Sequence, residues 1–267
     1  MLRIGISGVA GKMGRALVQA IFEAKDLSLG AAFESASSPV IGIDAGELAG
    51  VGKLDVIVEE LAEGSLNEVD IIIDFSLPAA TLSLAEICEI GLKGMVIGTT
   101  GFEKDQLSYL EKCSANIPIF MSPNMSVGVN VLFKLARIAS ESFGEEVDCE
   151  ILEAHHAQKI DAPSGTAVRL GEILAGSRSV DIRNVGTYGR EGSVGERMKQ
   201  EIGFSSIRGG DIVGDHTVFF IGEGERIEIT HRAQSRVNFA QGAIRAARFL
   251  SDKKSGLYDM EKLLDLS

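Results

Sequence analysis

The chain has 267 residues, 45% of them hydrophobic, which is enough for one large α/β domain or two smaller ones with a sizeable core. Its formal net charge of −12 excludes a general binder of nucleic acids or membrane surfaces, because such proteins need a basic field. No apolar run reaches the roughly 18 to 20 residues of a membrane span, and the apolar start of the chain is too short for a signal peptide.

Residues 1–122 predict a parallel sheet with helices between its strands. The run at 71–73 is three isoleucines, typical of a strand buried on both faces. Residues 16–21 place apolar side chains at helical spacing after the first strand. The predicted strands are 2–7, 27–34, 69–75, 94–98 and 117–121, and the later helices are 79–90 and 104–113. This alternation indicates an α/β fold with an N-terminal Rossmann-type, doubly wound parallel sheet.

The pattern changes beyond residue 122. A long helix is predicted at 127–143, a strand with interleaved charges at 147–154, and a helix that opens at Pro163. Residues 211–230 indicate an antiparallel hairpin, and 237–250 a last helix. We therefore expect two domains. They are a dinucleotide-binding domain at 1–126, on which 237–267 packs back, and a second α+β domain at 127–236 with an open mixed sheet.

The first predicted strand leads into a glycine-rich loop and a helix. Gly8, Gly11 and Gly14 have the spacing GxxGxxG, and Glu34 ends the next strand. Glycines let a diphosphate approach the backbone at a helix N-terminus, where free N–H groups favour anions, and the acid accepts hydrogen bonds from ribose hydroxyls. An ordinary glycine-rich turn is the alternative, but the strand, the helix and the acid together favour a binding site for NAD(P)H. A Walker A loop is excluded because Met13 replaces its Ser or Thr.

The second strand end also predicts which dinucleotide is preferred. Glu34 repels the 2′-phosphate of NADPH, and the adjacent Ser35 supplies no positive charge, so we expect NADH to be preferred. Lys12 attracts a phosphate, so NADPH is expected as a tolerated second cofactor. The polar turns at 98–101 and 122–126 follow parallel strands, where ligands bind, although each alone fits an ordinary turn. The predicted cofactor-binding residues are Gly8, Val9, Ala10, Gly11, Lys12, Met13, Glu34, Gly98, Thr99, Thr100, Ser122, Pro123, Asn124 and Met125.

Residues 153–166 hold the densest chemistry, with the sequence Glu-Ala-His-His-Ala-Gln-Lys-Ile-Asp-Ala-Pro-Ser-Gly-Thr. His155, His156 and Lys159 can supply a proton donor, and the Pro-Ser-Gly-Thr helix start can hold a carboxylate. We expect no metal, because adjacent strand residues point to opposite faces and no HExxH or cysteine partner accompanies the histidines. Ordinary core or surface histidines, a solvated lysine and an unliganded helix start remain the alternatives.

The three cysteines, Cys88, Cys113 and Cys149, are odd in number, widely spaced and without a CxxC pair. A disulfide framework or structural zinc site is therefore disfavoured, and a reducing compartment fits better. Together with the missing span and signal peptide, this predicts a cytoplasmic location.

With these motifs the chain resembles the 4-hydroxy-tetrahydrodipicolinate reductases, also called dihydrodipicolinate reductases, over essentially its whole length. The pattern Glu-Ala-His-His, Lys, Asp-Ala-Pro-Ser-Gly-Thr in 153–166 is highly specific to that family, whereas the glycine loop is not. The other matching stretches are 8–14, 44–50, 98–102, 124–130, 209–214 and 229–231.

The resemblance implies that hydride from NAD(P)H reduces 4-hydroxy-tetrahydrodipicolinate, a small cyclic dicarboxylate, to tetrahydrodipicolinate in lysine and diaminopimelate biosynthesis. It implies His155 and Lys159 as the catalytic pair, with Lys159 as proton donor, and a homotetramer assembled through the second domain's sheet. One departure argues against strong NADPH use, since many members have Arg where this chain has Ser35. The implied substrate-binding residues are His156, Ser164, Gly165, Thr166 and Arg236.

Two other functions share part of this pattern. A different two-domain Rossmann dehydrogenase has the glycine loop but does not need His-His-x-x-Lys followed by Pro-Ser-Gly-Thr. A regulatory protein that senses NAD(H) binds the cofactor without turnover. A turnover assay separates both from the reductase.

Overall fold

The computed structural model describes residues 1–62 and 64–266, whose contacts group the chain into two compact units. The first unit comprises Met1–Val127 and the segment from Arg236 onward, and the second comprises Gly128–Ser235. The boundaries predicted from the sequence lie one residue away. They fall where helix α5 (Val127–Phe143) begins and at the N-cap of helix α8 (Val237–Leu250).

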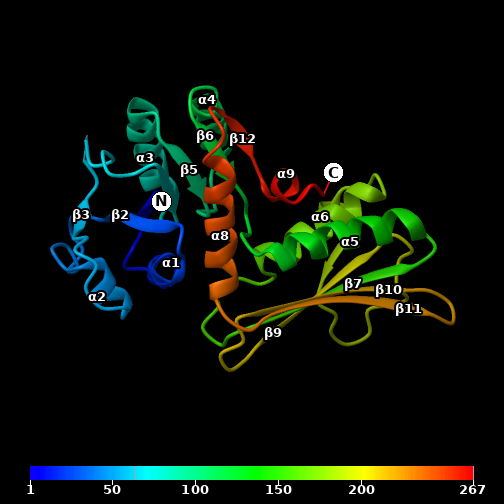
Figure 1. The fold of residues 1–267 in the computed structure, drawn as a ribbon. Helices are drawn as coiled ribbons and strands as arrows, with labels where there is room; N and C mark the ends of the chain where they lie inside the picture. Colours follow the sequence, from blue (N-terminus) through cyan, green and yellow to red (C-terminus); the bar gives the residue numbers. More distant parts are fainter. Residues whose placement is uncertain (63, 267) are drawn as a thin grey trace. The chain divides into compact units, whose positions relative to one another are not determined.

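The first unit is built on a parallel sheet of seven strands in the order β12-β6-β5-β4-β1-β2-β3 (Figure 1). Strand β1 pairs in parallel with β2 on one side and with β4 on the other, so the strand order reverses there. This is the predicted Rossmann-type topology, and its reversal point is where such sheets bind ligands. The strands are β1 (Leu2–Ser7), β2 (Leu27–Glu34), β3 (Val58–Glu60), β4 (Ile71–Asp74), β5 (Gly94–Ile97), β6 (Pro118–Met121) and β12 (Gly256–Tyr258).

Helices cover both faces of this sheet, which explains the three consecutive isoleucines of β4. Ile71 and Ile73 join one core cluster with Leu17 of α1 and Ile244 of α8, whereas Ile72 joins a second cluster on the other face. Burying each such side chain contributes roughly 1.5–3 kcal/mol, so a continuous apolar strand is stable only between two helical layers. The helices of this unit are α1 (Lys12–Glu23), α2 (Ala45–Ala49), α3 (Pro78–Gly91), α4 (Lys104–Cys113), α8 and α9 (Met260–Leu264).

The second unit holds a mixed sheet of five strands in the order β11-β10-β7-β9-β8, as expected for an α+β domain. Strand β10 runs antiparallel to β7 and β11, whereas β9 runs parallel to β7 and β8. Helices α5 and α6 cover one face of this sheet (Figure 1). The remaining elements are α6 (Gly165–Ser177), α7 (Ile182–Val185), β7 (Asp148–His155), β8 (Gly186–Tyr188), β9 (Ile202–Arg208), β10 (Gly214–Ile221) and β11 (Arg226–Ala233).

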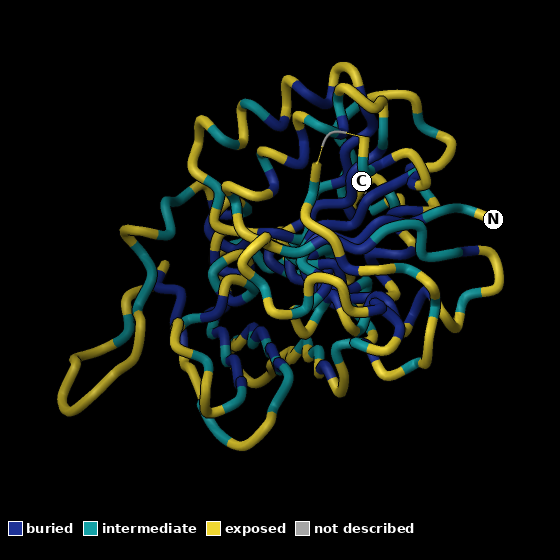
Figure 2. The backbone as a smooth tube through the Cα atoms, turned by 90° about the vertical axis from the view of Figure 1, so that its left-hand side faces the viewer, coloured by how far each residue is buried: buried dark blue, intermediate teal, exposed yellow. Residues whose placement is uncertain are grey.

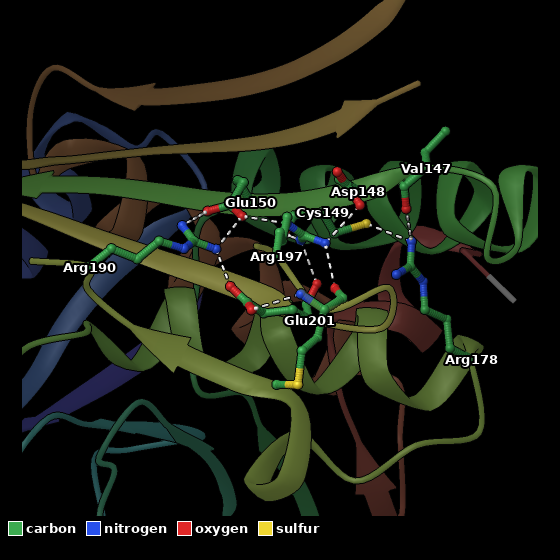
Figure 3. A network of polar contacts seen from close by, with 9 residues as sticks. Val147, Asp148, Cys149, Glu150, Arg178, Arg190, Arg197 and Glu201 are labelled. Carbon is green, nitrogen blue, oxygen red and sulfur yellow. Dashed lines mark hydrogen bonds and ion pairs between the residues drawn. The ribbon is translucent and has the colours of Figure 1, made fainter. Parts of the chain in front are cut away.

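Ion pairs tie the loop between β8 and β9 to the other face of the sheet (Figure 3). The guanidinium of Arg190 holds both carboxylate oxygens of Glu150, at 3.0 and 2.8 Å, and also contacts Glu201. Arg197 donates to Asp148 at 2.7 Å and to the carbonyl oxygen of Cys149 at 3.0 Å. These contacts fix a loop whose own side chains are mostly exposed.

Burial follows the secondary structure. Residues are buried mainly along the strands and on the inner sides of the helices, and they are exposed mainly along the loops (Figure 2). All three cysteines are free and buried. Each helix among residues 1–62 and 64–266 is too short or too polar to span a bilayer.

Candidate active site

The glycine loop folds into a tight cradle between β1 and α1. Gly8 adopts a left-handed φ of 79°, and a Cβ on it would lie 2.5 Å from the carbonyl oxygen of Phe75. A Cβ on Gly14 would lie 2.5 Å from the Cα of Val9 and closer still to the carbonyl oxygen of Gly8. Helix α1 begins without a side-chain cap at Gly11, so its first N–H groups are available to an anion.

Glu34 lies directly beside this cradle. One carboxylate oxygen accepts a hydrogen bond from the backbone N–H of Ala10 at 3.0 Å, and the other from the N–H of Ser35 at 3.1 Å. A cavity of about 570 Å³ opens next to it, within the first unit. The residues lining this cavity include Gly8, Gly11, Glu34, Ser35, Leu61, Phe75 and Leu77. An apolar cavity with a carboxylate at its edge fits the nucleoside part of a dinucleotide.

Asp74, at the end of β4, organises the neighbouring loop. It is fully buried and accepts hydrogen bonds from the hydroxyls of Ser76 at 2.7 Å, Thr81 at 2.5 Å and Thr99 at 2.8 Å. Thr99 in turn accepts from the backbone N–H of Ser76 at 2.9 Å. The sequence-based expectation named Thr99 but missed Asp74. A lone acid at the end of an apolar strand was the available signal.

The second predicted nicotinamide loop follows β6, next to β5. The hydroxyl of Ser122 donates to the carbonyl oxygen of Asn124 at 2.8 Å, and the side chain of Asn124 accepts from the N–H of Ser126 at 2.9 Å. Since β5 and β6 are paired in parallel, the loops that begin at Gly98 and Ser122 both lie at the carboxyl edge of the sheet. The structure thus brings the predicted cofactor residues to one edge of the first unit.

In the second unit, strand β7 ends at His155 in a buried ion cluster. His155 Nδ1 lies 2.5 Å from an oxygen of Glu153, whose side chain is 1% exposed. The two terminal nitrogens of Arg208, at the end of β9, donate to the two oxygens of Glu153 at 2.9 and 2.7 Å. The sequence pattern indicated no role for Glu153 and did not point to Arg208.

Lys159 lies on the loop that leaves β7. Its Nζ is 2.8 Å from an oxygen of Asp161, and its backbone N–H donates to the carbonyl oxygen of His156 at 3.1 Å. Arg208 also donates to the carbonyl oxygen of Asp161 at 2.6 Å. The hydrogen bond from the Lys159 side chain is the main reason that the pKa of Asp161 is lowered.

Helix α6 begins in the Pro-Ser-Gly-Thr segment, as predicted. Ser164 is its N-cap and accepts from the N–H of Ala167 at 3.3 Å, while Gly165 and Thr166 form its first turn. His216 of β10 lies 3.0 Å from the Ser164 hydroxyl and stacks edge-on against His155, with ring centroids 5.2 Å apart.

Burial and hydrogen bonding set the charges of this cluster. Burial opposes ionisation of Glu153, but hydrogen bonds from Arg208, Ser206 and His155 outweigh it and lower its pKa to about 2. Burial lowers the pKa of His155 against the opposing effect of Glu153. Burial and the charge of His155 lower the pKa of His216 to about 3. Near neutral pH the cluster therefore contains an ionised Glu153 beside neutral histidines.

The predicted substrate-binding residues belong to both units. His156, Ser164, Gly165 and Thr166 lie in the second unit with the catalytic candidates, whereas Arg236 lies in the first. Nδ1 of His156 is buried without a hydrogen-bond partner in the described part of the chain. Among those residues, no three His, Cys, Asp or Glu side chains form a group suited to a metal ion.

The buried neutral His216 predicts a pH-dependent stability. Its pKa falls from 6.5 to about 3 on folding, so its contribution is complete above pH 6.5 and is lost as the pH falls toward 3. Between these values the unfolded state binds a proton that the folded state does not. The free energy of unfolding therefore falls by about 1.4 kcal/mol for each unit by which the pH is lowered. We expect His216→Asn to flatten the pH dependence of the unfolding free energy by this slope, measured by urea unfolding at about pH 6 and about pH 5. An unchanged slope would contradict the neutral assignment.

Comparisons with known proteins cover both units. A family model described as "Dihydrodipicolinate reductase, N-terminus" matches residues 2–125, and one described as "Dihydrodipicolinate reductase, C-terminus" matches residues 128–264. A protein from Saccharophagus degradans named 4-hydroxy-tetrahydrodipicolinate reductase is 47% identical over 264 residues, which is 99% of this chain and 98% of that protein. A protein of the same name from Dechloromonas aromatica is 50% identical with the same coverage.

Solved structures resemble the chain in the same way. A dipicolinate-bound dihydrodipicolinate reductase from a Paenisporosarcina species has a TM-score of 0.77 at 25% identity and covers 97% of both chains. An amine dehydrogenase from Mycobacterium smegmatis has a TM-score of 0.62 at 12% identity, which is a likeness of fold alone.

Proposed function

The chain belongs to the dihydrodipicolinate reductase family, and we infer that it reduces 4-hydroxy-tetrahydrodipicolinate to tetrahydrodipicolinate with hydride from NAD(P)H, in lysine and diaminopimelate biosynthesis. The observation that carries this conclusion is the match to two relatives of that name, at 47% and 50% identity, over nearly the whole of each chain. An NAD(H) sensor or a different dehydrogenase does not account for that match.

We propose that the dinucleotide, which supplies the hydride, is held by the first unit. A Cβ would fill the cradle at Gly8 and Gly14, and the uncapped start of α1 presents N–H groups to a diphosphate. The cavity beside Glu34 takes the adenosine. The loops that begin at Gly98 and Ser122 hold the nicotinamide at the carboxyl edge of the sheet.

We propose that the start of α6 holds a carboxylate of the substrate. The N–H groups of Gly165 and Thr166 stand at a helix N-terminus of more than three turns, and Ser164 fixes its first turn. The related structure from Paenisporosarcina has dipicolinate bound, which is a ring with two carboxylates and supports this choice of ligand. His156 and Arg236 are the further residues proposed to contact the substrate.

We propose that Lys159 donates the proton that completes the reduction. Asp161 lies 2.8 Å from its ammonium and holds the side chain in place. His155 lies in the same segment, with Nδ1 turned to Glu153, and assists as a hydrogen-bond partner or proton relay. A positioned general acid typically accelerates a reaction by about 10²- to 10⁴-fold.

A coupled assay tests the activity. The condensation product of pyruvate and aspartate semialdehyde is made fresh by the preceding synthase, and the oxidation of NADH and of NADPH is followed in parallel. Rapid oxidation is the expected result. Folded protein that binds NADH but oxidises neither cofactor would overturn the substrate assignment.

We propose that NADH is preferred over NADPH, and Ser35→Arg tests this preference. Ser35 follows Glu34 and lines the same cavity, so an arginine there would place a guanidinium where a 2′-phosphate enters. We expect the ratio of kcat/KM for NADPH to that for NADH to rise by about 10-fold or more, since a charge-assisted hydrogen bond contributes about 1.5–3 kcal/mol. An unchanged ratio would mean that Lys12 or another group sets the preference.

We propose that the protein is a cytoplasmic homotetramer assembled through the sheet of the second unit. Helices α5 and α6 cover one face of that sheet, while side chains such as Leu152 and Phe219 are only half-buried on the other. Three buried free cysteines fit a reducing compartment. Light scattering of the purified protein measures the oligomer, and a monomer would contradict this proposal.

A further inference from the structure

The register of the second sheet gathers charged residues around the end of β7. Glu153 and His155 are two residues apart on β7, so both side chains point to the face that α5 and α6 cover. On β9, Ser206 lies opposite Glu153 and Arg208 opposite His155. On β10, His216 lies opposite Glu153. A buried carboxylate in this position is tolerated only because paired donors surround it.

Arg208 contacts both the partner of His155 and the partner of Lys159. Toward His155, its guanidinium holds both oxygens of Glu153, at 2.9 and 2.7 Å. Toward Lys159, the same guanidinium donates at 2.6 Å to the carbonyl oxygen of Asp161, the residue whose side chain pairs with the ammonium. A planar guanidinium can make these contacts at once because its donors are spread over three nitrogens, whereas the donors of an ammonium all lie on one nitrogen.

Glu153 also determines which nitrogen of His155 carries the proton. The carboxylate is ionised, and one of its oxygens lies 2.5 Å from Nδ1 of His155. Since a carboxylate only accepts hydrogen bonds, we assign the proton to Nδ1. Nε2 is then left with its lone pair, facing Gly214, where a Cβ would lie 3.0 Å away. The absence of a side chain at Gly214 leaves room beside this nitrogen.

We propose that Glu153 and Arg208 are positioning residues of the reductase, which together fix the tautomer of His155 and the location of Lys159. Glu153 holds the ring through Nδ1 so that Nε2 is the nitrogen available for catalysis. Arg208 holds Glu153 and the Asp161 backbone in one rigid arrangement. The inference rests on the proposed function, because it gives these residues a task only if His155 and Lys159 act on the substrate.

The chain supplies a matched control on the same strand. Glu150 is also on β7 and is also held through both oxygens by an arginine, Arg190 (Figure 3). It is three residues before Glu153 and therefore points to the opposite face of the sheet. Glu150→Gln removes a carboxylate that pairs with a guanidinium, as Glu153→Gln does, but leaves the surroundings of His155 intact.

The first test compares the two glutamine variants in the coupled assay. We expect Glu153→Gln to lower kcat by about 10- to 100-fold, as when the carboxylate partner of a functional histidine is removed, with KM largely unchanged. Glu150→Gln should keep the wild-type kcat. Arg208→Lys keeps the charge but loses the planar guanidinium, so its kcat should lie between that of the wild type and that of Arg208→Ala. The variants lie in the second unit, so circular dichroism and the melting temperature report whether each of them is folded.

The pH profile gives a readout that a purely structural role would not move. Glu153 on β7 raises the pKa of His155, while Lys159 of the following loop, Arg208 on β9 and burial lower it, and His216 on β10 faces the ring as a neutral group. Removing the negative charge of Glu153 lowers this pKa further. The limb of the kcat/KM profile that reports His155 should therefore move to lower pH in Glu153→Gln and stay in place in Glu150→Gln.

Each result decides the matter. Wild-type kcat and an unmoved limb in folded Glu153→Gln, or equal losses in both glutamine variants, would overturn the proposal. If Glu153→Gln does not fold, a wild-type kcat in Arg208→Lys overturns it and a lowered kcat supports it. His155→Gln distinguishes the catalytic role of His155 from the positioning role of Glu153. Unchanged turnover in that variant would remove His155 from the proposed function, whereas a loss there with normal Glu153→Gln would refute the positioning role alone.

Discussion

Lys159→Ala should lower kcat by about 100-fold or more, because it removes the proposed general acid, whose contribution is typically about 10²- to 10⁴-fold. NADH binding should persist, since the glycine loop and the cavity beside Glu34 belong to the first unit and Lys159 to the second. The measurement is kcat in the coupled assay, with NADH affinity determined separately by calorimetry. An equal loss of kcat and NADH binding would indicate a folding defect instead.

A second lysine of the chain is a close control for this variant. Lys53 forms an ion pair with Asp55, two residues on, at 2.6 Å, just as Lys159 pairs with Asp161 at 2.8 Å. The side chain of Lys53 is 64% exposed and belongs to the first unit, whereas that of Lys159 is 22% exposed. Lys53→Ala should keep wild-type turnover. Near-normal turnover in Lys159→Ala would remove that residue from the mechanism and leave the proton donor to be found elsewhere.

The sheet of the first unit could be predicted because its signal is local and strong. The isoleucines of β4 alternate between two helical layers, and such a run has few other stable solutions. The helices at 104–113, 127–143 and 237–250 were predicted with the bounds that the structure has. In each, apolar side chains recur at helical spacing over several turns.

The elements that were missed are short or depend on distant partners. Strands β3 and β12 have three residues each, and α2 has five, too few for a periodic pattern. Strand β9 reads Ile-Gly-Phe-Ser-Ser-Ile-Arg, in which glycine and serines weaken the strand signal. It forms because it pairs along its length with β7. Missing β9 also hid Arg208, which stands at its end.

Part of the candidate site could likewise be predicted from the sequence, and part of it could not. The segment from His155 to Thr166 is contiguous, so its chemistry was visible in the sequence. The contacts that orient it join residues far apart along the chain, since Arg208 is 55 positions from Glu153 and His216 is 52 from Ser164. Only the fold brings such pairs together. Glu153 was nevertheless detectable, because on a strand it must share a face with His155.

Gly14→Ala should weaken NADH binding by about 10-fold or more, by forcing the glycine loop out of shape. In a helix interior alanine is favoured over glycine by about 1 kcal/mol, so propensity alone predicts a small gain. Here the new Cβ would lie 2.5 Å from the Cα of Val9, and the neighbouring atoms are all backbone, which cannot rotate away. Overpacking of this kind costs about 1–3 kcal/mol and outweighs the propensity. NADH affinity measured by fluorescence titration tests it.

Gly91→Ala makes the same substitution where nothing stands in the way. Gly91 ends helix α3 of the same unit, and its Cβ would first meet the flexible side chain of Lys93, at 3.4 Å. That variant should bind NADH as the wild type does and be no less stable. If both variants bind normally, the backbone around Gly14 is softer than its contacts imply and the loop does not hold the diphosphate rigidly. If only Gly14→Ala fails, and its melting temperature stays close to that of the wild type, the loss lies in the cradle and not in the fold.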